Sequence, residues 1–337
     1  MRCVFTGKDA YEVKELESQV VLSIIIPHFN SPVLLEKLLD SIHVSPVIEV
    51  IVVDDNSDCA DELSQIMDRN PGVRILKNNA EHPKGAGSCR NIGLQHASGM
   101  WLTFADADDY YLAGFEDIVL SVIKQADDDV DIVYFPPKSI VLDTGLEGDR
   151  HRVQEALVLE YLSNGSHDNE IRLRFSSGGP WSKLIRRDLV ERHQIKFDEV
   201  IASNDVMFTL KTAYNARKTA ADSRAIYMIT TNKGSLTMQT SEKVANARLD
   251  VFVNRCRYLR ERLSKSDFKK LDFSGILYIS NSILYKLGIK HLFYTYRTLR
   301  KNHIPVLTLN QLKPNIFLRK AFKGVARHVK ARRFLIE

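Results

Sequence analysis

Residues 101–109 read WLTFADADD, an apolar strand followed at once by three carboxylates, Asp106, Asp108 and Asp109. Carboxylates this close in sequence must either be solvated or share a cation, and oxygen ligands of this kind suit Mg²⁺ or Mn²⁺. A cation at the end of such a strand in turn favours a diphosphate as its ligand. A plain acidic turn that leads into a helix near Gly114 is the competing interpretation.

The first 135 residues alternate short apolar runs with helical patterns. Strands are predicted at 21–26, 47–53, 73–76 and 101–104, the first stopped by Pro27, and helices at about 34–42, 61–69 and 87–97. Strands this apolar, each followed by a helix, predict a parallel sheet covered on both faces. Such sheets bind ligands at the carboxyl ends of their strands, where the polar clusters at 28–30, 54–57 and 106–109 fall.

The composition is that of a globular chain: 337 residues, 44% hydrophobic and 26% charged, enough for one large core or two smaller ones. A net charge of +5 is too small at this length to indicate a general polyanion binder. The four cysteines show no paired metal spacing and are expected to be free thiols in a reducing compartment. No apolar run approaches the roughly 20 residues that span a bilayer, and the start lacks a signal-peptide core, so a cytoplasmic protein is expected.

Four motifs carry a resemblance to a known family. They are IIIPHFN at 24–30, VVDDNS at 52–57, RNIG at 90–93 followed by ASG at 97–99, and DADD at 106–109. In this order and at these spacings they resemble the family 2 glycosyltransferases of the GT-A fold, inverting enzymes of the bacterial surface-polysaccharide type. The match is strong over residues 21–115, looser at 181–184, 204–206 and 234–237, and absent beyond 250.

The resemblance implies an α/β fold, a GT-A type, Rossmann-like, mostly parallel sheet sandwiched by helices, with a C-terminal helical appendage. Residues 1–20 are expected to form an N-terminal extension. The catalytic domain is expected at 21–245, with a nucleotide-binding half at 21–135 and an acceptor half at 136–245. Residues 246–337 are expected to form a helical region that ends in a basic amphipathic tail.

The resemblance assigns the donor nucleotide to the ends of the first strands. Asp55 would bond the base, and a carboxylate that accepts from an imide N–H suits uracil. Lys84 and Arg90 would approach the diphosphate or hold the acidic loop. The other pocket residues would be Pro27, Phe29 and Asn30. Without the resemblance, residues 54–57 read as a solvated turn that caps the next helix, and Lys84 and Arg90 as ordinary surface charges.

The resemblance also divides the work within the acidic loop. Asp108 would bind the metal, Mn²⁺ or Mg²⁺, and Asp106 the ribose or a metal-bound water, with Ala107 on the donor side. Asp109 is expected to cap the following helix rather than to bind the ion. When bound, the cation would stabilise the charge that builds on the departing diphosphate.

Transfer needs a base for the acceptor hydroxyl, and the family uses an acidic pair at the start of a later helix. The matching stretch is 202–208, in which Asp205 is the candidate base. Asn204 departs from the family pattern, because its position is often acidic, and it removes a charge that could raise the pKa of Asp205. Attack opposite the leaving nucleotide inverts the configuration. A cap by Ser203 or Asn204, with Asp205 in the first turn, is the structural alternative.

Two further segments complete the predicted site. Trp181 and Lys183, in the run GGPWSK at 178–183, would contact the acceptor, although a tryptophan buried in a packed loop explains the run nearly as well. A later loop would close over the diphosphate, with a plain surface turn as the alternative. Its donors would be Lys233, Ser235 and Thr237.

The end of the chain predicts helices and a basic tail. Apolar residues keep helical spacing from about 250 to 304. Residues 315–333 hold seven Lys or Arg and no acidic residue, with phenylalanines and valines that could share one face. A basic amphipathic helix can lie on an anionic membrane, which predicts peripheral contact with the inner face of the cell membrane. A solvated charged face is the alternative, and nucleic acid is disfavoured because no recognition motif accompanies the charge.

The sequence therefore predicts an inverting, metal-dependent glycosyltransferase of the hexosyltransferase type. The donor is expected to be a nucleotide-sugar, UDP-linked by preference, and the acceptor a saccharide, free or lipid-linked, in surface polysaccharide or lipopolysaccharide biosynthesis. A sugar-nucleotide nucleotidyltransferase is one alternative, but it would need a Gly-rich basic loop where residues 27–30 read PHFN. The other is an inactive, membrane-associated carbohydrate-binding protein, against which the full set of acidic residues argues.

Overall fold

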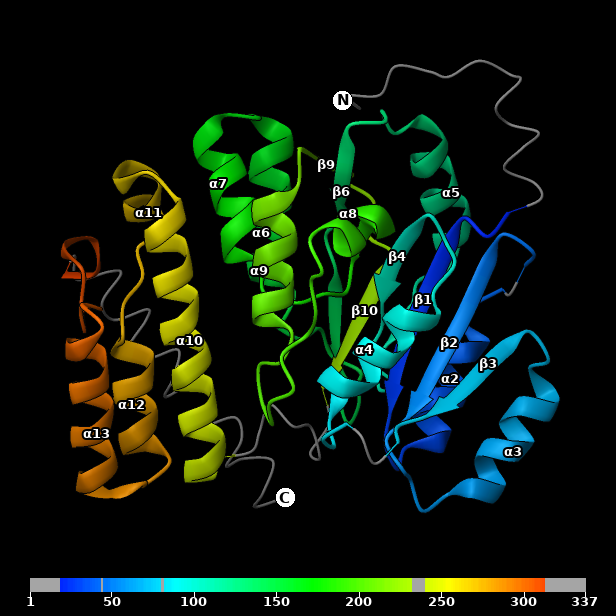
Figure 1. The fold of residues 1–337 in the computed structure, drawn as a ribbon, viewed down its shortest axis with the longest axis horizontal. Helices are drawn as coiled ribbons and strands as arrows, with labels where there is room; N and C mark the ends of the chain where they lie inside the picture. Colours follow the sequence, from blue (N-terminus) through cyan, green and yellow to red (C-terminus); the bar gives the residue numbers. More distant parts are fainter. Residues whose placement is uncertain (1–18, 44, 80–81, 232–239, 313–337) are drawn as a thin grey trace. The chain divides into compact units, whose positions relative to one another are not determined.

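The structure is a computed structural model that describes residues 19–43, 45–79, 82–231 and 240–312 (Figure 1). The chain divides into two compact units. The first contains residues 1–200 and 204–231, and the second contains residues 201–203 and 232–337. The domain limits predicted at residues 20, 135 and 245 remain predictions.

Among the described residues, a seven-stranded sheet forms the centre of the first unit. Its order is β3-β2-β1-β4-β8-β6-β9, with β8 antiparallel to both neighbours and the other pairs parallel. The predicted α/β class with a mostly parallel sheet is therefore confirmed. The strands are β1 (Leu22–His28), β2 (Ile48–Asp54), β3 (Val73–Lys77), β4 (Trp101–Phe104), β6 (Val130–Tyr134), β8 (Lys183–Arg186) and β9 (Lys218–Ala221).

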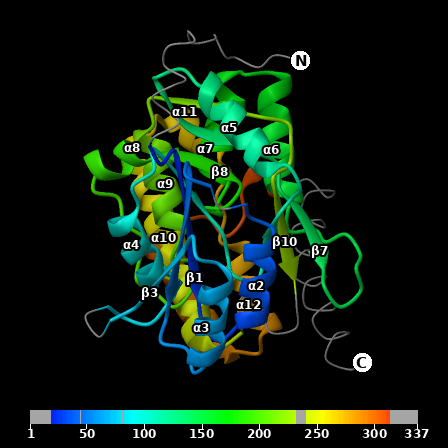
Figure 2. The ribbon, with the colours of Figure 1, turned by 90° about the vertical axis from the view of Figure 1, so that its right-hand side faces the viewer.

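Helices cover both faces of this sheet, with α2 and α4 on opposite sides of β1 (Figure 2). Ile24 and Val50 face the core shared with α2, α3 and α5, whereas Ile51 and Val53 pack against Ile92 of α4. Since alternate residues point to opposite faces, strands covered on both sides must be apolar throughout. The helices are α2 (Pro32–Asp40), α3 (Ala60–Arg69), α4 (Ala86–His96), α5 (Phe115–Gln125), α6 (Arg152–Ser163), α7 (His167–Ser176), α8 (Arg187–Arg192) and α9 (Val206–Asn215).

Strand β1 continues through Pro27, so the prediction that this proline stops the strand is wrong. Pro27 is in register with Val53 of β2. The pairing of β1 with β4 ends at Ile25, and the His28 carbonyl accepts a hydrogen bond from the Asp55 N–H on the β2 side. Successive residues present their polar groups to opposite sides of a strand, so the Pro27 nitrogen faces the side where pairing has ended. Its missing N–H therefore breaks no ladder bond.

A second sheet of three strands follows the acidic loop. Its order is β5 (Tyr110–Tyr111), β10 (Tyr227–Thr231) and β7 (Lys138–Val141). β10 is antiparallel to β5 and parallel to β7. Since β5 starts directly after Asp109, this pairing brings β10 alongside the acidic loop. None of the three strands was predicted, because β5 has two residues and its pairing is long-range.

The second unit is helical in its described part, which confirms the predicted C-terminal appendage. Helices α10 (Glu242–Arg262), α12 (Ile276–Leu284) and α13 (Gly288–Lys301) pack side by side, and α11 (Lys265–Lys270) and the 3₁₀ turn η3 (Leu309–Leu312) complete it. Its core joins Phe252 and Cys256 of α10 to Leu299 of α13. None of the helices in the described ranges is both long and apolar enough to cross a membrane.

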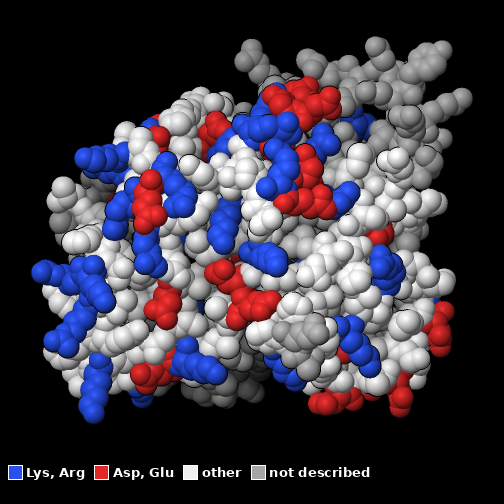
Figure 3. Space-filling view, in the orientation of Figure 1, with Lys and Arg blue, Asp and Glu red and all other residues white. Residues whose placement is uncertain are grey.

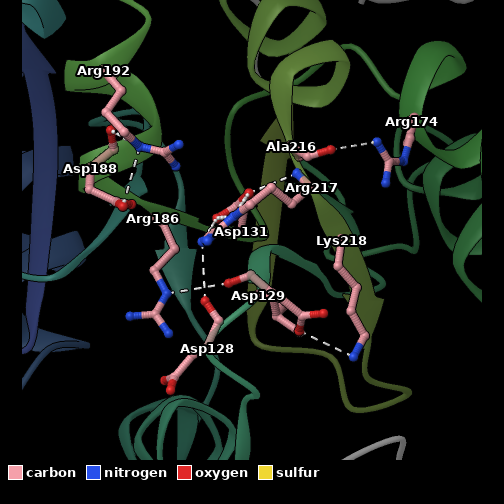
Figure 4. Close-up of polar contacts among 11 residues, drawn as sticks. Asp128, Asp129, Asp131, Arg174, Arg186, Asp188, Arg192, Ala216, Arg217 and Lys218 are labelled. Carbon is pink, nitrogen blue, oxygen red and sulfur yellow. Dashed lines mark hydrogen bonds and ion pairs between the residues drawn. The ribbon is translucent and has the colours of Figure 1, made fainter.

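A charged network lies at the sheet edge opposite the acidic loop, where β6 and β9 begin (Figure 4). The buried Asp131 carboxylate accepts from the Arg217 backbone N–H at 2.7 Å and from its guanidinium at 2.7 and 3.0 Å. Lys218 pairs with Asp127 at 2.7 Å and with Asp129 at 3.2 Å. Burial acts to raise the pKa of Asp131, but the Arg217 hydrogen bonds outweigh it and hold the pKa below its ordinary value.

We expect Asp131→Asn to lower the free energy of unfolding of the first unit by about 1.5–3 kcal/mol, because charge-assisted bonds to Arg217 are lost. Both tryptophans, Trp101 and Trp181, belong to this unit. Urea unfolding followed by tryptophan fluorescence therefore reports on the first unit. The matched control is Asp129→Asn, which breaks an exposed pair worth less than about 1 kcal/mol.

The pH dependence of this loss has a defined sign. A carboxylate with a lowered folded-state pKa stabilises the fold above its unfolded-state pKa, and the contribution disappears as the pH falls through the folded-state value. The difference between wild type and Asp131→Asn should be full at neutral pH and shrink below about pH 4. A difference that stays constant across this range would attribute the loss to packing instead of charge.

Candidate functional site

The acidic loop after β4 brings three carboxylates together. Oxygen atoms of Asp106, Asp108 and Asp109 all lie within 4.8 Å of one another. Asp106 and Asp108 are half-buried, whereas Asp109 is buried. Such a group can hold a metal ion, and the surroundings of each carboxylate decide which of them is available as a ligand.

Asp109 is held inside the protein by β10, so the prediction that it caps a helix is wrong. Its two carboxylate oxygens accept from the Thr230 N–H at 2.6 Å and from the Tyr227 hydroxyl at 2.9 Å. Burial, and then the charges of Asp106 and Asp108, raise the pKa of Asp109 well above its ordinary value. With both oxygens engaged, Asp109 shapes the loop instead of offering a free ligand.

The same two residues of β10 hold the rest of the loop. The Tyr227 hydroxyl accepts from the Asp106 N–H at 2.9 Å, and the Thr230 hydroxyl donates to the Asp108 carbonyl at 2.5 Å. Arg150 in turn donates to the Thr230 carbonyl at 2.8 Å. Sequence reasoning missed Tyr227, Thr230 and Arg150, since no local motif marks them and their partners are far away in the chain.

Asp108 is the carboxylate whose surroundings fit a cation best. Burial, and then repulsion by Asp106, raise its pKa to about 6, although Arg150 and Arg90 oppose this rise. Within the described ranges, no side chain forms a hydrogen bond or ion pair with this carboxylate. A divalent ion would compensate both the burial and the repulsion, so the residues present fit the predicted Mn²⁺ or Mg²⁺.

Arg90 of α4 joins the acidic loop to the segment that precedes Asp205. Its guanidinium donates to the Asp106 carboxylate at 2.5 Å and to the Asn204 side-chain oxygen at 2.8 Å. It also lies over the Phe197 ring, 5.3 Å from the ring centroid. Arg90 therefore lies on the acidic loop, and its contact with a diphosphate remains a prediction.

Gly87 permits the close approach of α4 to Asp198 and Asn204. A Cβ atom at position 87 would lie 2.2 Å from the Asp198 carbonyl oxygen and 3.1 Å from the Asn204 Cβ. The Asn91 side chain, on the same helix, donates to the Phe197 carbonyl at 3.1 Å and accepts from the Phe197 N–H at 2.8 Å. These contacts bring Asn204 within reach of Arg90.

Asp205 occupies the N-cap position of α9, yet its side chain forms no capping hydrogen bond. The side-chain oxygen of Asn204, the alternative cap, is bound by Arg90. Burial raises the pKa of Asp205, Arg90 opposes this rise and Asp106 adds to it. A carboxylate with a raised pKa that does not cap its helix is suited to accept a proton. The role of Asp205 as the base remains a prediction.

Of the residues predicted for the nucleotide, Phe29, Asn30 and Asp55 directly follow β1 and β2. The buried Asp55 accepts from the Asn78 side-chain amide at 2.7 Å. Asn30, at a positive φ of 48°, donates its N–H to the Ser57 hydroxyl at 2.8 Å. Phe29 is 49% exposed, and the Lys84 ammonium lies 4.7 Å from its ring centroid. Asn78 was not among the predicted residues.

The neighbouring residues His28, Asp54 and Ser57 are arranged for structure and do not form a hydrolase triad. Asp54 contacts His28 Nδ1 at 2.9 Å and the Ser57 hydroxyl at 2.5 Å. His28 Nε2 accepts from the Ser31 N–H at 3.2 Å, so Nδ1 carries the proton and Nε2 is not available as a base. The group instead fixes the turns that carry Phe29, Asn30 and Asp55.

Trp181 stacks on Tyr227, the residue that holds the acidic loop. Their rings are 6.0 Å apart and 5° from parallel, and Trp181 is half-buried. A Cβ atom at Gly179 would lie 2.4 Å from Trp181 Cε2, so glycine makes room for the indole. Lys183 is 3% exposed, with its ammonium 5.2 Å from the Tyr134 ring centroid. The acceptor roles of both residues remain predictions.

Two predicted segments lie outside the described residues. They are the diphosphate loop, with Lys233, Ser235 and Thr237, and the basic tail at 315–333.

Comparison with known proteins identifies the family. The sequence profile of glycosyl transferase family 2 matches residues 23–194, about half of the chain. The chain belongs to this family. It is therefore a glycosyltransferase, as the four motifs indicated.

Individual relatives agree with this family and show the fold. EpsH of Bacillus subtilis, named as a glycosyltransferase, is 23% identical over 276 residues, 78% of this chain and 76% of EpsH. Residues 1–349 of Staphylococcus aureus TarS, solved with UDP-GlcNAc, superpose with a TM-score of 0.66 at 19% identity, over 93% of this chain and 92% of that one. A mannosyltransferase of Pyrobaculum calidifontis, solved with GDP-Man and Mn²⁺, gives a TM-score of 0.55 at 15% identity, covering 97% and 91%. The predicted GT-A fold is confirmed.

We expect Tyr227→Phe to weaken Mn²⁺ binding about tenfold, because it removes two loop hydrogen bonds but keeps the ring stacked on Trp181. The matched control is Tyr111→Phe, since the buried Tyr111 hydroxyl has no hydrogen-bond partner in the described part of the chain. Mn²⁺ titration by electron paramagnetic resonance measures both variants. Equal affinities for Tyr227→Phe and wild type would show that β10 does not set the shape of the metal site.

Proposed function

We propose that this family 2 glycosyltransferase is inverting and metal-dependent, and that it moves a sugar from a nucleotide-sugar to a saccharide or lipid-linked saccharide. The observation that carries the proposal is the presence of two carboxylates with raised pKa values: Asp108, half-buried and suited to a cation, and Asp205, at the start of α9, whose side chain makes no capping hydrogen bond. Arg90 links the segments that carry them. The process would be surface polysaccharide or lipopolysaccharide biosynthesis.

A UDP-sugar is the proposed donor. Asn78 orients Asp55 at the strand ends, where its carboxylate would accept from the imide N–H of uracil. Phe29 offers an exposed aromatic face for the base, and Lys84, above that ring, offers a positive charge near the phosphates. That TarS, a protein of the same fold, was solved with UDP-GlcNAc also supports this donor.

Asp108, with Asp106, would hold the Mn²⁺ or Mg²⁺. When bound, the ion neutralises charge on the leaving diphosphate. Tyr227 and Thr230 bind the main chain of Asp106 and Asp108 and so hold the loop that carries the two carboxylates. Arg90 keeps Asp106 paired, so Asp108 is the less neutralised of the two carboxylates.

Asp205 would remove the proton from the acceptor hydroxyl. The oxygen would then attack the anomeric carbon on the side opposite the leaving nucleotide, which inverts the configuration. The raised pKa of Asp205 makes its carboxylate a better proton acceptor near neutral pH. Trp181 and Lys183 would contact the acceptor, with the indole facing the sugar ring.

We also propose peripheral contact with the inner face of the cell membrane. The support is the basic, acid-free run at 315–333, together with the chemistry of a lipid-linked acceptor.

We expect Asp108→Asn to lower nucleotide-sugar transfer about a hundredfold or more and to abolish its response to Mn²⁺, because the carboxylate ligand is lost. The assay is UDP release from a panel of UDP-sugars with a saccharide acceptor. Asp117→Asn, at an exposed carboxylate of α5, is the control and should match wild type. Full wild-type activity in excess chelator would exclude metal dependence. Absence of transfer with every donor would favour the carbohydrate-binding alternative.

We expect Asp205→Asn to bind the donor as wild type does but to lose transfer about 10²- to 10⁴-fold, because it keeps the shape and removes the base. Asp198→Asn is the matched control, since burial raises the pKa of this nearby half-buried carboxylate as well. Calorimetry with UDP measures binding, and single-turnover kinetics measures transfer. Transfer within a few-fold of wild type in Asp205→Asn would rule this residue out as the base.

A further inference from the structure

Helix α13 exposes a row of apolar side chains to solvent. Ile289 is 64% exposed, Phe293 61% and Tyr296 43%. Their spacings of four and three residues put them on one side of the helix. The opposite side is committed to the core of the second unit, where His291, Thr295 and Leu299 are buried. In the described part of the chain, the row is therefore a second, solvent-exposed face of the same helix.

Basic side chains accompany this row. Arg297 and Arg300 are exposed on the same side of α13, and Lys290 and Lys301 flank them. Between residues 273 and 312 the chain has five Lys or Arg and no Asp or Glu. Figure 3 shows basic side chains at its left edge, where Figure 1 draws α13. We call Ile289, Phe293, Tyr296, Arg297 and Arg300 the α13 face.

The combination of charge and exposure selects the partner. Single exposed apolar side chains are common, but three in register on one helix of a globular unit are not explained by solvation. A second copy of the chain would bring like charges together, which disfavours self-association. An acidic polymer would satisfy the arginines and lysines and leave Ile289 and Phe293 in water. An anionic lipid surface satisfies both, because it offers phosphates beside acyl chains.

We propose that the α13 face docks on an anionic membrane surface. With 14 residues, α13 is about 21 Å long and would lie parallel to the bilayer plane. Phe293 and Ile289 would enter the boundary between headgroups and acyl chains, Tyr296 would keep its hydroxyl at headgroup level, and Arg297 and Arg300 would contact phosphates. The α13 face consists of described residues only.

The α13 face is independent of sugar-transfer chemistry. It contains none of the residues proposed for donor, metal or acceptor binding. Variants of the face should therefore keep the wild-type rate of UDP release from UDP-sugars with a saccharide acceptor in solution. Failure of the proposed function would show in that assay, whereas failure of the membrane proposal would show only with vesicles.

The test is co-sedimentation of the full chain with vesicles of phosphatidylcholine that contain about 30% phosphatidylglycerol, compared with pure phosphatidylcholine. Wild type should bind the anionic vesicles more tightly. Phe293→Ser should lower the partition coefficient about tenfold, because an aromatic side chain no longer enters the boundary. Arg297→Glu combined with Arg300→Glu should lower it at least about 25-fold, at roughly fivefold for each of the two basic charges lost.

A matched control separates the α13 face from total charge. Lys265→Glu combined with Lys269→Glu makes the same change in net charge on two exposed residues of α11. This variant should bind nearly as wild type does, while the tail is unchanged in every variant. Wild-type binding by Phe293→Ser, or an equal loss in the α11 control, would overturn the proposal. Heparin provides a second check. If wild type binds heparin but not the anionic vesicles, and Phe293→Ser binds heparin equally well, the partner is a polyanion and the membrane proposal is overturned.

Discussion

The hydrogen bonds between Asp109 and β10 determine the shape of the acidic loop. A buried carboxylate is costly unless its oxygens are hydrogen-bonded, and here the Thr230 N–H and the Tyr227 hydroxyl engage one oxygen each. The same two side chains also bind the main chain of Asp106 and Asp108. A change in the path of the loop would therefore leave the buried Asp109 side chain without its hydrogen-bond partners. Because the Tyr227 ring stacks on Trp181, the predicted acceptor segment also packs against β10.

Arg90 distributes charge among the remaining carboxylates. It pairs with Asp106, while its second bond goes to the neutral Asn204. An acid at position 204 would compete with Asp106 for the guanidinium and would repel Asp205. The amide keeps the link between the two segments without adding charge. In the described part of the chain, Asp108 and Asp205 are therefore the carboxylates of this group that Arg90 does not bind and whose pKa burial raises. This agrees with the different roles proposed for them.

Much of the fold could be predicted from local patterns. Strands β1, β2 and β4 are apolar over most of their length and almost fully buried, which is the signature of burial on both faces, and the helices between the strands carry regular apolar spacing. The end of β1 was predicted too early because of Pro27. A proline is compatible with a strand where the neighbouring strand has ended, and here that depends on where the pairing with β4 ends. The second sheet could not be predicted, since β5 has two residues and gains its partner from far along the chain.

The site shows the same limit. Motifs located Asp55, Arg90, Asp106, Asp108 and Asp205, because each follows a strand or starts a helix in a recognisable pattern. Tyr227, Thr230, Arg150 and Asn78 have no such pattern, and their contacts arise only when distant segments meet. Asp109 was given the wrong role for this reason: its local sequence favours a cap, whereas β10 supplies stronger partners.

Gly87 carries a consequence for how this site tolerates change. Position 87 has no side chain to offer a substrate, yet any Cβ there would collide with the Asp198 carbonyl and press on Asn204. The collision would move the start of α9 away from α4, and with it Asp205 away from Arg90 and the acidic loop. The enzyme would keep every chemical group and lose their spacing. The site therefore depends on a position that has no room for even one methyl group, and a substitution there would act through the distances between groups and not through their chemistry.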